Sequence, residues 1–444
     1  MELKETILSP VGKTRGGTHL PHHKNTSLCE SVFLPTPDKV IIPMRQHIGA
    51  ACEPVVKKGD KVYVGTLIGD IDRLVSAPVH SSVSGTVEKI DKILMPDGQY
   101  VDAVFIDSDG EMTPDPKLKA PVIKTKEDLI IATRDCGLVG LGGAGFPAHV
   151  KFRVKDDVHL DTLIVNGAEC EPYITADERC CLEDYSDILE GVYLIKEMLG
   201  IERVIIAVEN NKEEAIEKLY EVACDTRDTD DTVKVMRLTT RYPQGAEKVL
   251  IYSVLKRKVP AGKLPSDVGC VVMNVSSVAA LYRYVRTGMP LVNRRLTVDG
   301  GAVTEPKNLI VPIGTKVSDI LDFCGRNEDG PSRLLLGGPM MGTALPSDDF
   351  VITKTNNAIL SLVEDEIPRP TGCIHCGRCA AHCPMKLNPS AVEQALTANS
   401  VDRIRSLYAD YCMECGSCAY SCPARRPLAQ IMRMAKKELR RNAK

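Results

Sequence analysis

Eight of the chain's 17 cysteines fall into two short motifs between residues 373 and 422. Both motifs read C-x2-C-x2-C-x3-C-P, and 7 of their 12 positions are identical. Thiolates at this spacing hold three corners of an iron–sulfur cubane, and the cysteine before proline ligates the other cluster of the pair. The repeat therefore predicts two [4Fe–4S] clusters. The first set of ligands is expected to be Cys373, Cys376, Cys379 and Cys422, and the second set Cys383, Cys412, Cys415 and Cys418.

Zinc is the main alternative for clustered cysteines, but zinc sites use two C-x2-C pairs and not triplets followed by C-P. No charged segment followed by an apolar one opens the chain, so we expect no secretory signal and a reducing compartment. The nine other cysteines, including Cys180 and Cys181, are then expected to be small buried hydrophobic residues rather than disulfides.

A second feature is the glycine-rich segment from Gly140 to Phe146, which contains G-x-G-x-x-G. The dinucleotide fingerprint needs a strand immediately before the glycines, whereas Thr125 to Asp135 predicts a capped helix. A tight packing turn is one interpretation. The other is a ligand loop, since glycines let the backbone approach a phosphate or a flat ring. Lys151 could then meet the phosphate.

Two acids, Glu169 and Glu171, follow a predicted strand at 163–165. The carboxyl ends of strands are where open α/β sheets bind ligands. Carboxylates there can accept hydrogen bonds from ribose hydroxyls or from a nicotinamide amide. A solvated turn is the alternative interpretation.

The elements that position these residues fall into several units, because 444 residues are too many for one compact domain. Residues 1–113 form an arm and an all-β unit that resembles a biotinyl-type barrel-sandwich hybrid without its modified lysine. Residues 121–288 alternate strands (204–208, 233–238) and helices (212–222), which indicates an α/β domain. A hairpin turning at 299–301, a helix at 317–324 and a strand at 333–336 predict a β-grasp unit over 289–346. After a linker at 364–370, residues 365–444 form a helical ferredoxin domain.

Several features allow a bland and a functional interpretation. His19, His22 and His23 could suggest a metal, but an extended arm is the simpler explanation. Ser390 to Glu393 is typical of a capping box that opens a helix, and 401–407 suggests a second helix. The tail from residue 424 has eight basic residues and an apolar helical stripe. It could dock on anionic lipid or an acidic partner, or pack on the ferredoxin domain.

Composition excludes some functions. A net charge of −3, 4% aromatic residues and no tryptophan argue against nucleic-acid binding. The best candidate for a membrane span, 268–285, is interrupted by polar residues, so we expect no helix of this chain to span a bilayer.

The segments 137–151 and 165–172 resemble the flavin- and NADH-binding subunit of respiratory complex I, and 242–248 and 272–276 follow in the same order. The resemblance implies an α/β domain with non-covalent FMN over the glycine loop and NAD(H) stacked on the flavin near Phe146 and Glu171. Glu171 would orient the nicotinamide nucleotide and Lys151 would neutralise the FMN phosphate. The implied cofactor residues are Gly140, Gly142, Gly143, Gly145, Phe146, Lys151, Asn166, Glu169, Glu171, Tyr242, Gly245, Glu247 and Asn274.

Complex I differs in two respects, since it has an arginine-containing loop at 138–141 and a single C-terminal cluster. With its 16–19 arm and hybrid domain, the chain is similar over nearly its whole length to the RnfC/RsxC family, whose members belong to the Rnf electron-transport complex. The resemblance implies a SLBB-like β-grasp domain and a peripheral, NAD(H)-binding subunit on the cytoplasmic side of the plasma membrane. Integral membrane and peripheral Rnf subunits would be its partners. They would exchange electrons with ferredoxin and couple this to Na+ or H+ translocation.

Two rival functions stay open at this point. A soluble cobalamin (corrin) reductase shares the flavin loop and two clusters, but its loop lies close to the N-terminus, whereas more than 100 residues precede it here. An electron-carrier scaffold with a dead flavin site would keep the clusters without NADH activity. A flavin is expected because it can exchange both hydride and single electrons.

Overall fold

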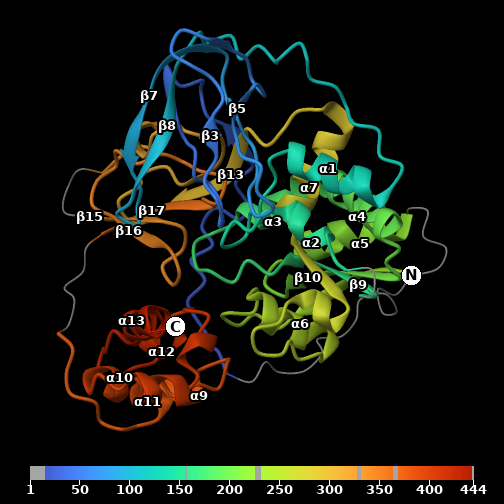
Figure 1. Cartoon of the computed structure of the whole chain (residues 1–444). Helices are drawn as coiled ribbons and strands as arrows, with labels where there is room; N and C mark the ends of the chain where they lie inside the picture. The colour runs from blue at the N-terminus through green and yellow to red at the C-terminus, as the bar shows by residue number, and fades with distance from the viewer. Residues whose placement is uncertain (1–15, 156–157, 226–231, 328–331, 364–368, 443–444) are drawn as a thin grey trace.

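Figure 1 shows the computed structural model of the chain, which folds into successive units joined by short connections. The structure describes residues 16–155, 158–225, 232–327, 332–363 and 369–442. The first part of the predicted arm, most of the linker at 364–370 and Lys444 lie outside the described residues. No helix in the described part of the chain is long and apolar enough to cross a bilayer.

The N-terminal β domain contains two small sheets (Figure 1). Strands β2 (Lys39–Pro43), β8 (Tyr100–Ser108), β7 (Gly85–Leu94) and β4 (Lys61–Val62) pair in that order. Strands β3 (Glu53–Pro54), β5 (Leu67–Asp70) and β6 (Val79–His80) form the second sheet. Alternate residues such as Val40 and Ile42 are fully buried between the sheets. The architecture agrees with the predicted hybrid domain.

The α/β domain has a parallel sheet in the order β11-β10-β9-β12. Its strands are β9 (Thr162–Gly167), β10 (Arg203–Glu209), β11 (Val233–Leu238) and β12 (Cys270–Asn274). They are rich in Val and Ile because helices cover both faces of the sheet. The helices are α1 (Lys126–Asp135), α2 (Ala148–Phe152), α3 (Ala176–Glu183), α4 (Tyr185–Leu199), α5 (Glu213–Asp225), α6 (Glu247–Leu255) and α7 (Val275–Thr287).

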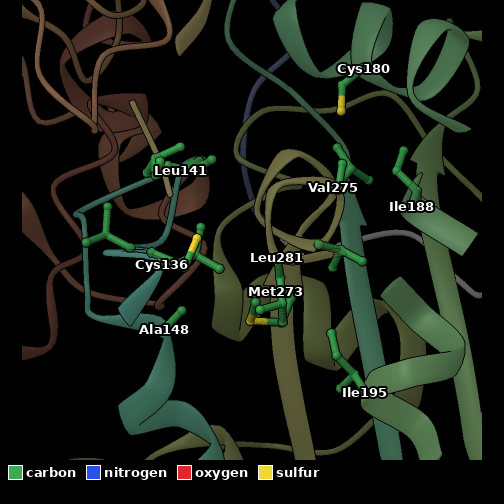
Figure 2. Close-up of a cluster of buried hydrophobic side chains, with 14 of the residues drawn as sticks. Cys136, Leu141, Ala148, Cys180, Ile188, Ile195, Met273, Val275 and Leu281 are labelled. Carbon is green, nitrogen blue, oxygen red and sulfur yellow. The ribbon is translucent and has the colours of Figure 1, made fainter. Parts of the chain in front are cut away.

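The main hydrophobic core lies directly beneath the glycine loop (Figure 2). Leu141 of the loop is buried there, and Met273, Val275 and Leu281 belong to the same cluster. Of the nine scattered cysteines, six are buried and Cys29 and Cys170 are partly buried. The side chain of the ninth, Cys224, lies outside the described residues. Those that Figure 2 labels, Cys136 and Cys180, contribute to the core as small apolar side chains.

The β-grasp unit is built on a six-stranded sheet in the order β1-β14-β13-β17-β15-β16. A hairpin joins β13 (Asn293–Asp299) to β14 (Lys307–Pro312), and α8 (Val317–Phe323) follows, as predicted. Strands β15 (Ser332–Leu336) and β16 (Thr343–Leu345) complete the predicted range. The sheet extends past residue 346, because β17 (Ala358–Val363) pairs with both β13 and β15. Strand β1 (Ser31–Phe33) reaches it from the N-terminal arm.

The ferredoxin domain is helical and lies at the opposite end of the molecule from the β domain (Figure 1). Its helices are α9 (Arg378–Ala381), α10 (Pro389–Thr397), α11 (Val401–Ser406), α12 (Ser417–Tyr420) and α13 (Leu428–Arg441). The apolar stripe of α13 (Leu428, Met432, Ala435 and Leu439) is buried against this domain. The stripe therefore packs on its own domain, and the basic face of α13 is left at the surface.

The predicted capping box at Ser390 is wrong. Helix α10 begins two residues earlier, after Asn388, whose Oδ1 accepts the Ala391 N–H at 3.2 Å. Asn is a strong N-cap residue and Pro389 suits the first helical position. Glu393 is instead bound by the Arg426 guanidinium, whose Nε lies 2.9 Å from its carboxylate.

A buried lysine joins three of the units. Lys354, which is 1% exposed, lies between β16 and β17. Its ammonium donates to the carbonyl oxygens of Pro78 in the β domain and Gly137 in the α/β domain, at 2.5 and 2.7 Å. Its backbone N–H donates to Gln46 Oε1 at 3.0 Å. Burial lowers the pKa of the Lys354 ammonium to about 8.

Replacing Lys354 by methionine should therefore destabilise the junction of these units. The two buried carbonyls would lose their donor, at a net cost of about 2–4 kcal/mol after the burial cost of the charge is removed. We expect the midpoint of thermal unfolding to fall by about 5–10 °C. Exposed Lys58 in the β domain gives a matched Lys58→Met control. An unchanged midpoint in Lys354→Met would contradict this role.

Candidate redox site

The predicted cofactor residues gather at the carboxyl edge of the parallel sheet. Strands β10 and β11 lie on one side of β9, and β12 lies on the other, so the chain reverses direction across the sheet between β9 and β12. Asn166 at the end of β9 is paired in register with Asn274 at the end of β12. Open α/β sheets bind ligands at such a switch point.

The two asparagines shape this edge through their side chains. Asn166 Nδ2 donates to the Gly245 carbonyl at 2.9 Å, just before α6. Asn274 caps α7, because its Oδ1 accepts the N–H groups of Ser276 and Ser277 at 3.0 and 3.3 Å. Its Nδ2 donates to Asp177 at 2.6 Å. Asn274 therefore joins the start of α7 to α3 directly below the glycine loop.

The glycine loop is held at its ends and open in its middle. The Leu141 N–H donates to Ser277 Oγ, and its carbonyl accepts from Arg294 Nη2, both at 3.0 Å. The Gly140 N–H donates to the Phe146 carbonyl at 2.9 Å, which closes the loop. Gly142, Gly143 and Ala144 are exposed.

The middle of the loop has the space that a bound phosphate or ring requires. A Cβ on Gly142 would lie 2.5 Å from Asn274 Nδ2, so only glycine fits above this side chain. The exposed, side-chain-poor backbone of 142–144 therefore fits a flavin phosphate or ring placed over the switch point. Gly143 has no neighbour at its Cβ position, which leaves that side open.

Replacing Gly142 by alanine should weaken flavin binding without unfolding the protein. The new methyl group would displace Asn274 or lift the loop from it, and we expect the dissociation constant for FMN to rise by about tenfold or more, about 1.4 kcal/mol. Flavin fluorescence measured on titration of the flavin-stripped chain checks this. Iron content should stay unchanged. Equal affinity in both proteins would show that the loop does not contact the flavin.

Lys151 and Glu247, both predicted to lie around FMN, lie close to one another. The Lys151 ammonium donates to the Val272 carbonyl at 2.8 Å and lies 3.5 Å from Glu247 Oε1. Val272 precedes Asn274 by two residues on β12, which is about 7 Å along a strand. The ammonium is therefore near the switch point but already has protein partners, and its contact with a phosphate stays a prediction.

Glu169 does structural work that the sequence did not reveal. It adopts a positive φ of 44°, and its carboxylate accepts the N–H groups of Asp177 and Glu178 at 2.6 and 3.2 Å. These are at the start of α3, where a carboxylate is favourable. Burial raises the pKa of Glu169 to about 8, an effect that the Lys24 ammonium 4.0 Å away opposes.

Glu171 holds a loop of the β-grasp unit. Its two carboxylate oxygens accept the N–H groups of Met340 and Met341 at 3.0 and 2.9 Å. A Cβ on Gly338 would overlap this carboxylate. Burial raises the pKa of Glu171 to about 7. The carboxylate thus ties the α/β domain to the β15–β16 loop, and its predicted contact with the nicotinamide nucleotide stays untested.

The N-terminal arm supplies residues that sequence reasoning missed. The Lys24 ammonium donates to the carbonyl oxygens of Glu169 and Glu171, each at 3.0 Å, and to that of Ile174. His23 stacks on Tyr173 with ring centroids 4.8 Å apart. A single lysine in an irregular arm carries no sequence signal for such a role. The arm therefore folds against the loop that carries the two acids.

The second set of cysteines surrounds one cavity. Cys383, Cys412, Cys415 and Cys418 all line it, with apolar side chains such as Met385 between them. The Leu387 N–H and the Glu414 N–H point at the sulfurs of Cys383 and Cys412, each at 3.3 Å. Among the described residues, no three His, Cys, Asp or Glu side chains converge closely enough for a single metal ion. Four sulfurs spread around a cavity fit a polynuclear cluster better.

The second set borders the α/β domain. The Tyr242 hydroxyl donates to the Cys415 carbonyl at 2.7 Å. The arm runs alongside, since the Thr18 N–H donates to the Tyr242 carbonyl and the Gly17 N–H to the His382 carbonyl, both at 2.7 Å. Tyr242, predicted from the resemblance as a cofactor residue, therefore contacts a cluster-ligand segment directly.

The first set lies nearer the surface. Cys373 and Cys376 are exposed, Cys422 is partly buried and Cys379 is buried. Cys379 and Cys422 belong to the same small hydrophobic cluster as Leu428 of α13. The two sets therefore differ in environment although their motifs are nearly the same.

Four family models match the chain, in the predicted order. They are described as the RnfC barrel sandwich hybrid domain (residues 12–111), the Nuo51 FMN-binding domain (133–283), the SLBB domain (295–344) and the 4Fe-4S dicluster domain (372–425). The predicted fold class and the predicted cofactors, FMN and two [4Fe–4S] clusters, are confirmed.

A solved structure shares the fold. A chain of an NAD+-reducing [NiFe]-hydrogenase in its H2-reduced state superimposes with a TM-score of 0.52 at 17% identity. The match covers 71% of this chain and 63% of that one, and it shows the fold alone.

Curated relatives are similar over most of the chain. The RnfC component of the proton-translocating ferredoxin:NAD+ oxidoreductase complex of Clostridium ljungdahlii is 42% identical over 85% of this chain and 82% of its own length. The Na+-translocating counterpart of Acetobacterium woodii is 41% identical over 96% and 97%. These matches favour the predicted family over the corrin reductase. The chain belongs to the RnfC family of the ion-translocating ferredoxin:NAD+ oxidoreductase, or Rnf, complexes.

Proposed function

We propose that this chain is the NAD(H)-binding, electron-relaying subunit of a ferredoxin:NAD+ oxidoreductase complex. The named relatives are subunits of such complexes, and the chain has both an FMN-binding domain and a dicluster domain. The single observation that carries the proposal is the contact between these two domains. Tyr242, at the carboxyl edge of the sheet, donates its hydroxyl proton to the Cys415 carbonyl.

The residues divide the task between them. FMN, when bound, exchanges hydride with NAD(H) and single electrons with iron–sulfur clusters. The open loop at 142–144 and Asn274 would hold the flavin, and Lys151 would balance its phosphate charge. No general acid or base is needed for hydride transfer. Cys415 and the rest of the second set lie on the side of the ferredoxin domain that faces the flavin domain.

The partners are proposed to be the other members of an Rnf-type complex. We assign ion movement to integral membrane subunits, and we place this chain peripherally on the cytoplasmic side. Ferredoxin would exchange electrons with it through another subunit. The support is that the relatives carry the names of ion-translocating complexes.

An anaerobic NADH titration of the full chain tests the proposal. We expect about eight irons and one releasable FMN per chain, and bleaching of flavin and cluster absorbance by NADH. An electron-carrier scaffold would keep its irons but would not respond to NADH, and that result would contradict the proposal. The corrin reductase predicts rapid reduction of added cob(II)alamin, and the proposed relay role predicts co-purification with integral membrane subunits.

A further inference from the structure

The two cysteine motifs are nearly the same in sequence but differ in exposure. Every residue from Cys373 to Arg378 is exposed. At the corresponding positions of the second motif, Cys412 to Glu414 are partly buried and Cys415 to Ser417 are buried. The second motif is covered by the α/β domain and by the β15–β16 loop, where the Met340 carbonyl lies 3.2 Å from a Cβ built on Gly416. Within the described residues, the first motif has no comparable cover.

Positive charge is concentrated in the ferredoxin domain. Between Arg369 and Asn442 there are twelve Lys or Arg and five Asp or Glu residues, whereas the whole chain has a net charge of −3. Three of these arginines, Arg369, Arg378 and Arg425, are exposed and lie close to the first motif in the chain or across a contact.

A backbone contact brings these arginines to one place. The Thr371 N–H donates to the Ala424 carbonyl at 3.0 Å, which sets Arg369 and Arg425 on either side of the exposed motif. Arg426 is already committed, because it binds buried Glu393 and the Thr371 carbonyl. The negative charge of a cluster with its four thiolates would repel an acidic partner. Exposed arginines around that cluster offset this repulsion.

An apolar side chain stands in the middle of this positive surface. Ile374 is 66% exposed and directly follows Cys373. A small apolar centre with a charged rim suits a transient protein contact, in which rim charges steer the encounter and few contacts hold it.

We propose that residues 373–378, with Arg369 and Arg425, form a docking face for an acidic protein domain that carries its own iron–sulfur cluster. The proposal rests on the proposed function and identifies the partner of the same relay. Each encounter transfers one electron, so that the donor cluster is oxidised and the acceptor cluster reduced, with no bond or proton exchanged. Exposed cysteine ligands permit the short approach that such a transfer requires.

Binding of a purified acidic two-[4Fe–4S] ferredoxin to the cofactor-loaded full chain tests this face. We expect the affinity to fall steeply with salt, because exposed charges are screened within about 10 Å at 0.1 M salt. An Arg369→Glu/Arg378→Glu/Arg425→Glu variant should bind at least about tenfold more weakly at low salt and with little salt dependence. The matched control reverses three exposed charges of the distant β domain, as Lys57→Glu/Lys58→Glu/Lys61→Glu, and should bind like wild type.

Further variants and arms keep the result interpretable. Ile374→Ser should weaken binding without changing its salt dependence, and all variants must retain their irons. Wild-type affinity in the arginine variant, or equal loss in the lysine control, would overturn the proposal. It would also be overturned if the arginine variant lost binding only to phosphatidylglycerol vesicles and kept ferredoxin binding, since the face would then be a lipid surface. NADH bleaching of the same samples reports on the proposed function separately.

Discussion

Replacing Cys415 by serine should remove the second cluster, leave flavin reduction by NADH intact and prevent electrons from reaching the first cluster. The serine keeps the carbonyl that accepts the Tyr242 hydroxyl, so the domain contact is preserved while one sulfur of the cavity is lost. We expect the iron content to fall from about eight to about four per chain. The rate of NADH-dependent reduction of the remaining cluster should fall by about a hundredfold or more, an increase of about 2.7 kcal/mol in the barrier.

Cys376→Ser is the matched variant because it removes an exposed ligand of the first set. It should also lose about four irons, but the remaining second cluster should still be reduced by NADH at the wild-type rate. Cys29→Ser, a partly buried cysteine of the arm, controls for the substitution itself. Freeze-quench electron paramagnetic resonance measures each cluster. Rapid reduction of the first cluster in Cys415→Ser would show that the second set does not lie between it and the flavin.

The sequence predicted the features that depend on local spacing. The helix capped by Thr125, the strand at 233–238 and the cysteine repeat each carry their signal within a few residues. The start of α10 was missed by two residues because Ser390 and Asn388 both suit an N-cap, and Pro389 decides in favour of Asn388. Local chemistry can only rank such neighbours.

The features that escaped prediction join distant parts of the chain. Glu171 meets Met340 and Met341, 169 and 170 residues further along. Strand β17 lies beyond the expected end of the β-grasp unit, yet it pairs between β13 and β15. A carboxylate at the end of a strand indicates a ligand when read alone. Only the fold shows that Glu169 and Glu171 both accept backbone N–H groups of the protein.

The same limit applies to the two cysteine motifs. Their sequences agree at 7 of 12 positions, and nothing within them indicates which one is covered. Coverage is decided by Tyr242, by the Met340 loop and by the arm at Gly17, all of which precede the motifs in the chain. The ligand assignment thus follows from spacing, whereas the direction that each cluster faces follows from packing between domains.

Replacing Lys24 by methionine should disrupt the loop that carries Glu169 and Glu171. The Lys24 side chain is 13% exposed, and its ammonium is the donor for three carbonyls of that loop. Glu169 and Tyr173 adopt positive φ values of 44° and 70°, which cost about 1–3 kcal/mol each in a residue with a side chain. Loss of the ammonium removes the contacts that stabilise this conformation. We expect a destabilisation of about 3–5 kcal/mol.

Hydrogen exchange of residues 169–175 should rise in Lys24→Met, FMN affinity should fall, and the iron content should stay unchanged. Lys24→Arg should recover little, because a planar guanidinium cannot direct donors to the three carbonyls as an ammonium does. Exposed Lys124 provides the control, as Lys124→Met. Exchange protection equal to wild type would show that the arm does not hold the loop.

The effect of Lys24→Met should also depend on pH in a defined direction. Burial holds the pKa of Glu169 near 8, above its ordinary value of 4.5, although the Lys24 ammonium lowers it. Without that ammonium the folded chain binds its proton still more tightly than the unfolded chain does. Stability is then lost as pH rises from about 4.5 through the folded pKa. The destabilisation relative to wild type should therefore be larger at pH 8 than at pH 6, where Glu169 can stay neutral. A destabilisation independent of pH would mean that Lys24 acts on the carbonyls alone and not on the Glu169 carboxylate.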